Sequence, residues 1–230
     1  MRTTLLLCLF CTIVQCNHSK WVSRVGGLVP SYFPGNLGQR IGSTAFLLRT
    51  VYEPRPNTRS FLTARHTMNY LKNATDIRGG LRIFAHGDMK RGWPILSDFP
   101  FTDRDVSLLT VQIEPMEFAH DDGFILDEED MITVGATVSV MGYPSEVKQT
   151  PLRTFIGTVL LRNELNLTIT GPLLVPGFSG GPIVVGPDSF HIIAVIIQVN
   201  STIAPTPHVR GQIVTDTLLH NLLAHSREDL

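Results

Sequence analysis

The sequence predicts an all-β protein whose strands form closed barrels. Between residues 40 and 200 the chain is a series of short apolar and β-branched runs, each ended by Gly, Pro, Asn or Asp. These runs recur at the close spacing that is typical of antiparallel barrels. We expect strands at residues 44–51, 60–64, 81–85, 106–113, 137–141, 153–161, 165–170, 183–185, 191–199 and 211–214.

The composition is that of one compact globular protein. Of the 230 residues, 43% are hydrophobic and 17% are charged, which argues against a disordered or fibrous chain. The formal net charge is −1, and no basic cluster occurs along the chain. We therefore expect no nucleic-acid partner.

The first sixteen residues have the pattern of a secretory signal peptide. Arg2 precedes an apolar run from Leu5 to Val14, and Cys16 ends the segment. About ten apolar residues are too few for a spanning helix, which needs about twenty, so we expect no stable membrane insertion. A bacterial lipoprotein leader ending at Cys16 is the weaker alternative. The sequence thus predicts a secreted, extracellular protein whose mature chain begins near Asn17.

The mature chain is expected to have no cysteine and to carry glycans. All three cysteines lie within the leader, which leaves no disulfide and no thiolate metal site; a chain of this length can bury enough surface to fold without disulfides. Four Asn-x-Ser/Thr sites are more than chance would give and favour a eukaryotic secretory route. The glycosylation candidates are Asn17, Asn73, Asn166 and Asn200.

The mature chain divides into segments at changes in composition. We predict an N-terminal segment at 17–40, a first barrel at 41–118, an acidic connector at 119–132, a second barrel at 133–215, and a C-terminal helix with its tail at 216–230. Four leucines form one face of that short helix, after Thr215 and Asp216 as candidate caps.

The acidic connector is expected to be a solvated loop. Eight acids lie between Glu114 and Asp130, and their oxygens could in principle bind calcium. The spacing of a dedicated calcium loop is absent, however, and His120 has no second histidine at a ligand-like spacing. We expect neither a metal nor a cofactor.

The hexapeptide GFSGGP, at residues 177–182, places Ser179 between glycines that let the backbone turn tightly. It resembles the nucleophile turn of a serine protease, in which main-chain N–H groups face the oxygen of the attacked carbonyl. The same letters also fit G-x-S-x-G, the strand-to-helix elbow of α/β-hydrolases. The motif by itself therefore leaves two architectures open.

A serine nucleophile needs a histidine to take its proton and an acid to hold that histidine's tautomer. Of the eight histidines, His66 is favoured because it ends the apolar run FLTARH, where a strand delivers a side chain to a loop. Asp105 stands directly before the apolar run VSLLTVQI, so a barrel strand would anchor its backbone. Asp103 is its local competitor.

The blocks FLTARH, DVSLLTV and GFSGGP, in the order His, Asp, Ser, resemble the three active-site blocks of trypsin-like serine proteases. The absence of cysteines and the segments VGATVSVMGYPSE and RTFIGTVLL are most similar to HtrA-type proteases and glutamyl endopeptidases. The resemblance implies two antiparallel six-stranded, chymotrypsin-like barrels, with His66 and Asp105 from the first and Ser179 from the second. It also implies an oxyanion hole made by the Gly177 and Ser179 amides, and a protein or peptide substrate.

Two positions depart from the trypsin pattern. Trypsin-like zymogens keep an Asp directly before the serine, which pairs with the new N-terminal ammonium, whereas this chain has Phe178. We therefore expect no zymogen activation by that route. Arg65 places a cation directly before the proposed base, so its side chain must either face away from His66 or perturb it.

The resemblance also indicates substrate-binding residues. Leu173 and Leu174 lie where an Asp would pair with a basic substrate side chain, which favours a small or medium apolar residue in the first specificity pocket. Ile197, Gln198 and Val199 match the edge strand that pairs with an extended substrate backbone.

Two other functions stay open. An α/β-hydrolase esterase would need a helix after Ser179 and an alternation of strands and helices, but the chain after Ser179 begins Gly180-Gly181-Pro182 and is rich in β-branched residues. A catalytically inactive homologue could use the same two barrels as a protein-binding module, because a fold does not guarantee its activity.

Overall fold

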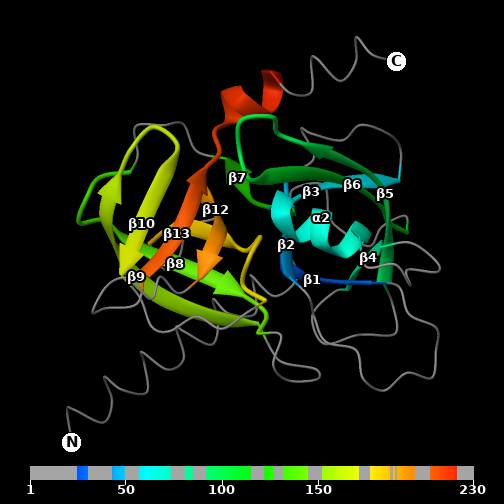
Figure 1. Cartoon of the computed structure of the whole chain (residues 1–230), viewed down its shortest axis with the longest axis horizontal. Coiled ribbons are helices and arrows are strands. Elements are labelled where there is room, and N and C mark those ends of the chain that lie inside the picture. Colours follow the sequence, from blue (N-terminus) through cyan, green and yellow to red (C-terminus); the bar gives the residue numbers. More distant parts are fainter. Residues whose placement is uncertain are drawn as a thin grey trace, which may run out of the picture.

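Figure 1 shows two β-barrels side by side in a computed structural model of the chain. The structure describes residues 25–30, 43–49, 57–73, 81–84, 92–114, 122–126, 132–144, 152–170, 177–186, 189, 191–199 and 208–221. Its elements are β1 (Val25–Pro30), β2 (Ser43–Leu47), β3 (Thr58–Ala64), α2 (Arg65–Asn73), β4 (Leu81–Phe84), β5 (Gly92–Pro100), β6 (Val106–Gln112), β7 (Ile125–Leu126), β8 (Thr137–Gly142), β9 (Arg153–Arg162), β10 (Asn166–Thr170), β11 (Pro182–Val185), β12 (His191–Val199) and β13 (His208–Ile213).

The first barrel is closed by six antiparallel strands in the order β1-β2-β3-β6-β5-β4, and β1 pairs with β4 to close it. The sequence did not predict β1 or β5. Strand β5 pairs with β6 and β4 although it contains Pro94 and Asp98, residues that argue against a strand, and most of its side chains are half-buried rather than alternating.

The second barrel is built from β8 to β13. Its sheet runs β11-β8-β9-β10-β13-β12-β7, and a further pairing of β11 with β12 closes the barrel. The short β7 joins β12 in parallel at His191 and Ile192. The predicted all-β fold of two barrels is confirmed.

Alternate residues of the strands face different cores. On β2, Ala45 and Leu47 point into the first barrel, whereas Phe46 belongs to a cluster of buried side chains that both barrels supply. On β12, Ala194 lies in the second barrel's core and Val195 in the shared cluster. Because both faces of these segments are buried, residues 45–47 of β2 and 192–196 of β12 are all apolar.

The sequence did not predict α2, which follows directly from β3. Its Met68 and Leu71 are buried in the core of the first barrel, while Asn69 and Tyr70 are exposed. Two buried apolar residues in nine are too few to give a clear helical pattern in the sequence. The second residue of this helix is His66, the histidine that the sequence favours as the base.

The C-terminal helix was predicted, and residues 216–221 are helical. Thr215 caps it, since its Oγ1 accepts the N–H of Leu218 at 3.3 Å. Leu219 is fully buried in the cluster between the barrels, so the helix docks where the two barrels meet.

The segment before β7 fastens the connector to the first barrel. Phe124 is fully buried; its N–H donates to the Leu47 carbonyl at 2.8 Å, and its carbonyl accepts the Arg49 N–H at 3.0 Å. The Phe124 ring meets Phe46 edge to face, with centroids 5.8 Å apart. Phe124 is thus held by backbone and ring contacts together.

We predict that Phe124→Ala lowers the free energy of unfolding by about 3 to 5 kcal/mol, because it leaves a cavity in the cluster shared by the barrels. Urea unfolding followed by circular dichroism measures this loss. Phe99→Ala is the matched control, since the Phe99 side chain is 37% exposed and its removal should cost far less. Equal losses in the two variants would contradict this account of the connector.

Candidate active site

Asp105 and His66 form a two-point contact. One carboxylate oxygen, Oδ2, lies 2.6 Å from Nδ1 of the His66 ring, and the other, Oδ1, accepts the His66 backbone N–H at 2.7 Å. The Asp105 carbonyl also accepts the N–H of Arg65 at 3.1 Å. Asp105 therefore orients the imidazole and caps the first turn of α2, where helix amides lack partners of their own and favour a negative charge.

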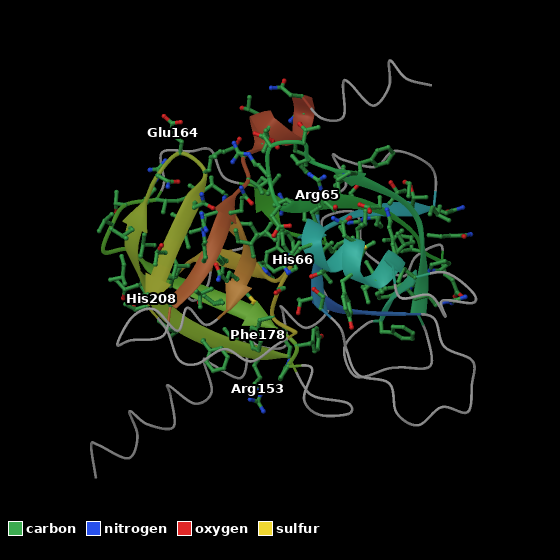
Figure 2. The ribbon with its side chains drawn as sticks, viewed as in Figure 1. Arg65, His66, Arg153, Glu164, Phe178 and His208 are labelled. Atoms are coloured by element: carbon green, nitrogen blue, oxygen red, sulfur yellow. The ribbon has the colours of Figure 1, made fainter. Side chains whose placement is uncertain are left out.

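The neighbours of this pair have other partners. The Arg65 guanidinium donates to the Phe101 carbonyl at 3.0 Å, which gives that cation a place on the first barrel next to His66 (Figure 2). Asp103, the competitor for the acid, is exposed and lies 3.6 Å from the guanidinium of Arg104. Geometry therefore selects Asp105 as the carboxylate that meets His66.

The GFSGGP turn has glycines where a side chain would not fit. Gly177 and Gly180 have positive φ angles of 104° and 85°. A Cβ on Gly180 would lie 2.1 Å from the Thr44 carbonyl oxygen, and one on Gly181 would lie 2.0 Å from the Met141 carbonyl oxygen. The two glycines after Ser179 thus permit the backbone to pack closely against both barrels.

A dipeptide of the first barrel, Ser43-Thr44 on β2, holds the turn. The Ser179 carbonyl accepts the Thr44 N–H at 2.9 Å and also the Ser43 hydroxyl. The Thr44 hydroxyl donates to the Gly177 carbonyl at 2.8 Å and accepts the Tyr143 N–H at 3.0 Å. Among the described residues, no acceptor bonds to the Gly177 or Ser179 N–H.

The same network reaches α2. The Ser43 hydroxyl lies 3.2 Å from the hydroxyl of Thr67, the residue after His66, and Thr63 at the end of β3 donates to the Thr44 carbonyl at 2.8 Å. All of these hydroxyls are buried. Buried hydroxyls that are paired in this way fix the distance between the turn and the start of α2.

Phe178 anchors the turn from the other side. It is fully buried in the second barrel's core and packs against Phe155, with ring centroids 5.6 Å apart. A side chain on Gly142 would collide with its ring at 2.6 Å. Nearby, Tyr143 is 1% exposed, and burial raises the pKa of its hydroxyl well above the ordinary value, which keeps it neutral.

The structure brings some of the predicted site residues together. His66 and Asp105 are in contact, and the Ser179 turn lies against β2 and the end of β3, since a Cβ on Gly180 would be 2.9 Å from the Ala64 N. Among the described residues, no hydrogen bond joins Ser179 Oγ to His66. The His66 side chain is 46% exposed, so its free ring edge is accessible.

The structure describes some of the other predicted positions. Residues 197 and 198 lie on β12, half-buried and exposed respectively, and Val199 ends that strand. Asn166 is half-buried at the start of β10, and Asn73 ends α2. The leader, Asn17, Leu173, Leu174 and Asn200 lie outside the described residues.

Three residues of the site were missed by reasoning from sequence. Ser43 and Thr44 hold the Ser179 turn, and Gln212 accepts the Asp105 N–H. Ser43 and Thr44 gave a signal, since they are polar residues at the start of the otherwise apolar β2, whereas Gln212 did not stand out because β13 (HVRGQI) has other polar residues. The described part of the chain contains no group of His, Cys, Asp or Glu that could hold a metal ion, and no helix in it is long and apolar enough to cross a membrane.

Comparison with known proteins identifies the fold. No protein-family model matches the chain, and no curated protein does. Among solved structures, an "HtrA-type protease AlgW with decapeptide" matches with a TM-score of 0.60 at 16% identity, over 92% of this chain and 68% of that chain. The chain has the chymotrypsin-like fold. At 16% identity the match shows the arrangement of the two barrels and does not show which reaction the protein catalyses.

We predict that Gly180→Ala destabilises the protein by more than the strain of its positive φ alone, because the new Cβ meets two oxygens of the first barrel. Gly186→Ala is the matched control, since Gly186 has a φ of 66° and open space around it. We expect a loss of about 1 kcal/mol for the control and at least twice that for Gly180→Ala, measured by urea unfolding. Similar losses would argue against tight packing of the turn.

Proposed function

We propose that this protein is a secreted serine endopeptidase that hydrolyses peptide bonds through His66, Asp105 and Ser179. The observation that carries the proposal is the contact of Asp105 with both the ring and the backbone of His66, on a fold whose second barrel presents a Ser179 turn fastened to the first. A carboxylate in that position favours the tautomer whose Nε2 is free to accept a proton.

The reaction follows in two steps. Ser179 Oγ attacks the scissile carbonyl while His66 Nε2 takes its proton, and His66 then protonates the leaving amine, which leaves an acyl-enzyme. A water molecule, deprotonated by His66, attacks the acyl carbonyl, and Ser179 regains its proton. Asp105 stays ionised throughout and holds the imidazole in place.

The oxyanion of each tetrahedral intermediate would be held by the Gly177 and Ser179 amides. Their availability supports this role, because among the described residues no acceptor bonds to either N–H. Removing one such donor costs on the order of 3 kcal/mol of transition-state stabilisation. Of the two, Gly177 also needs its positive φ, which only glycine adopts without strain.

The substrate is proposed to be an extended peptide that pairs with residues 197–199. Residues 198 and 199 pair with β13 on one side, and Ile197 lies at a register shift. Among the described residues no strand pairs with 197–199 on the other side, since β11 and β7 contact only the earlier part of β12. Such an edge can accept a further strand. Leu173 and Leu174 would favour a small or medium apolar side chain in the first specificity pocket, and the sequons remain proposed glycan sites of a secreted chain.

Covalent labelling tests whether Ser179 is a nucleophile. A fluorophosphonate should label the leaderless protein and fail to label Ser179→Ala, whereas Ser189→Ala should be labelled like the wild type. The same three proteins, incubated with a proteome-derived peptide library, should show cleavage after small or medium apolar residues in all but Ser179→Ala. Identical library patterns with and without Ser179 would point to a binding module rather than a protease.

Asp103, two residues before Asp105, serves as the control for a test of the role of Asp105. Asp105→Asn should lower kcat by roughly 10⁴-fold, because an amide no longer holds the required histidine tautomer. Asp103→Asn makes the same chemical change at a carboxylate that meets Arg104 instead, and should leave kcat near that of the wild type. Steady-state kinetics on a peptide substrate measures kcat for both variants. A larger loss of kcat in Asp103→Asn would show that Asp103, and not Asp105, is the acid.

A further inference from the structure

Gln212 connects the second barrel to Asp105. It lies on β13 with 6% of its surface exposed, and its side-chain Oε1 accepts the Asp105 backbone N–H at 2.7 Å. The next residue, Ile213, accepts a hydrogen bond from Arg104 through its carbonyl at 2.6 Å. Two adjacent residues of the first barrel are therefore bonded to two adjacent residues of the second.

With this bond, each polar group of Asp105 has a partner. Its carboxylate oxygens bond to the ring and the N–H of His66, its carbonyl accepts the Arg65 N–H, and its own N–H donates to Gln212. The first three contacts join Asp105 to α2, which begins at the same point of the same barrel. Among the hydrogen bonds that Asp105 itself makes to described residues, the Gln212 bond is the one that reaches the barrel that carries Ser179, and the Arg104–Ile213 bond lies beside it.

A short bonded path then runs from the base to the nucleophile turn. Gln212 follows Gly211, which pairs with Ile196 on β12. The Ile196 carbonyl accepts the Gly180 N–H at 2.7 Å, and Gly180 is the residue after Ser179. Gln212 thus connects Asp105, through β13 and β12, to the residue that follows Ser179.

We propose that Gln212 is a positioning residue of the His66–Asp105 pair. The inference rests on the proposed protease function, and it assigns to Gln212 the orientation of the base toward Ser179 rather than contact with substrate. The Asp105 N–H is part-buried, so without an acceptor it would lose a hydrogen bond that water cannot fully replace, and the turn before β6 would shift. A shift of that turn moves the imidazole, to which catalysis is sensitive.

Gln212→Met tests this most directly, because methionine keeps the length of the side chain and removes the strong acceptor. The kcat per titrated active site should fall about tenfold, with KM unchanged, as one lost positioning bond predicts. Gln212→Asn, one methylene shorter, is a second variant that should lose the same contact. Gln212→Glu keeps an acceptor and should recover most of the activity. Gln112→Met, at the exposed end of β6, is the matched control.

A second measurement does not depend on activity. In the Ser179→Ala background, amide hydrogen exchange of Asp105 should be slow while Gln212 is present and faster once Gln212→Met is added, and the NMR resonance of the His66 Nδ1 proton should broaden. If the exchange rate and kcat per active site both stay at their wild-type values, the assignment of Gln212 is wrong. If the wild type is not labelled by a fluorophosphonate, the proposed function fails, while the exchange rates still decide whether Gln212 holds Asp105.

Discussion

The arrangement of the site depends on one carboxylate that does two jobs. Asp105 bonds to the His66 ring with one oxygen and to the first turn of α2 with the other. The helix therefore begins where the carboxylate is, and the imidazole is aimed by the same group that starts the helix. A displacement of Asp105 would move the start of the helix and the His66 ring together. The ring therefore keeps its position relative to the Asp105 carboxylate.

The two barrels meet through an apolar cluster that cannot by itself fix their register, because burial is not directional. Hydrogen bonds between the barrels fix their relative position. Ser43 and Thr44 bond to the Ser179 turn, and Gln212 bonds to Asp105. Each contact joins a residue of one barrel to the chemically important segment of the other. The alignment of the Ser179 turn with His66 is thus set by a few hydrogen bonds within a larger hydrophobic contact, where exclusion of water makes them selective.

Much of the fold could be predicted from local patterns, and the part that could not depends on distant contacts. Strands such as 191–199 are apolar on both faces because both faces are buried, so the sequence shows them plainly. Helix α2 has no local cap and only two buried apolar residues; its cap is Asp105, which lies 39 positions away. Strand β5 is held between β4 and β6 despite Pro94. For the site, the blocks around His66, Asp105 and Ser179 were readable, whereas Ser43, Thr44 and Gln212 act through partners that no local pattern reveals.

Phe178, the residue before Ser179, holds the turn by apolar burial. Where trypsin-like zymogens use a buried ion pair to form the turn before the serine, this chain buries an aromatic ring against Phe155 and the open face of Gly142. An ion pair forms only when its partner charge is present, and its strength changes with protonation. Apolar burial needs no partner created by cleavage and has no titrating group, so Phe178 holds its side of the turn as soon as the core of the second barrel forms. The geometry of the turn therefore depends on the folding of both barrels, through Phe178 in the second and through Ser43 and Thr44 in the first.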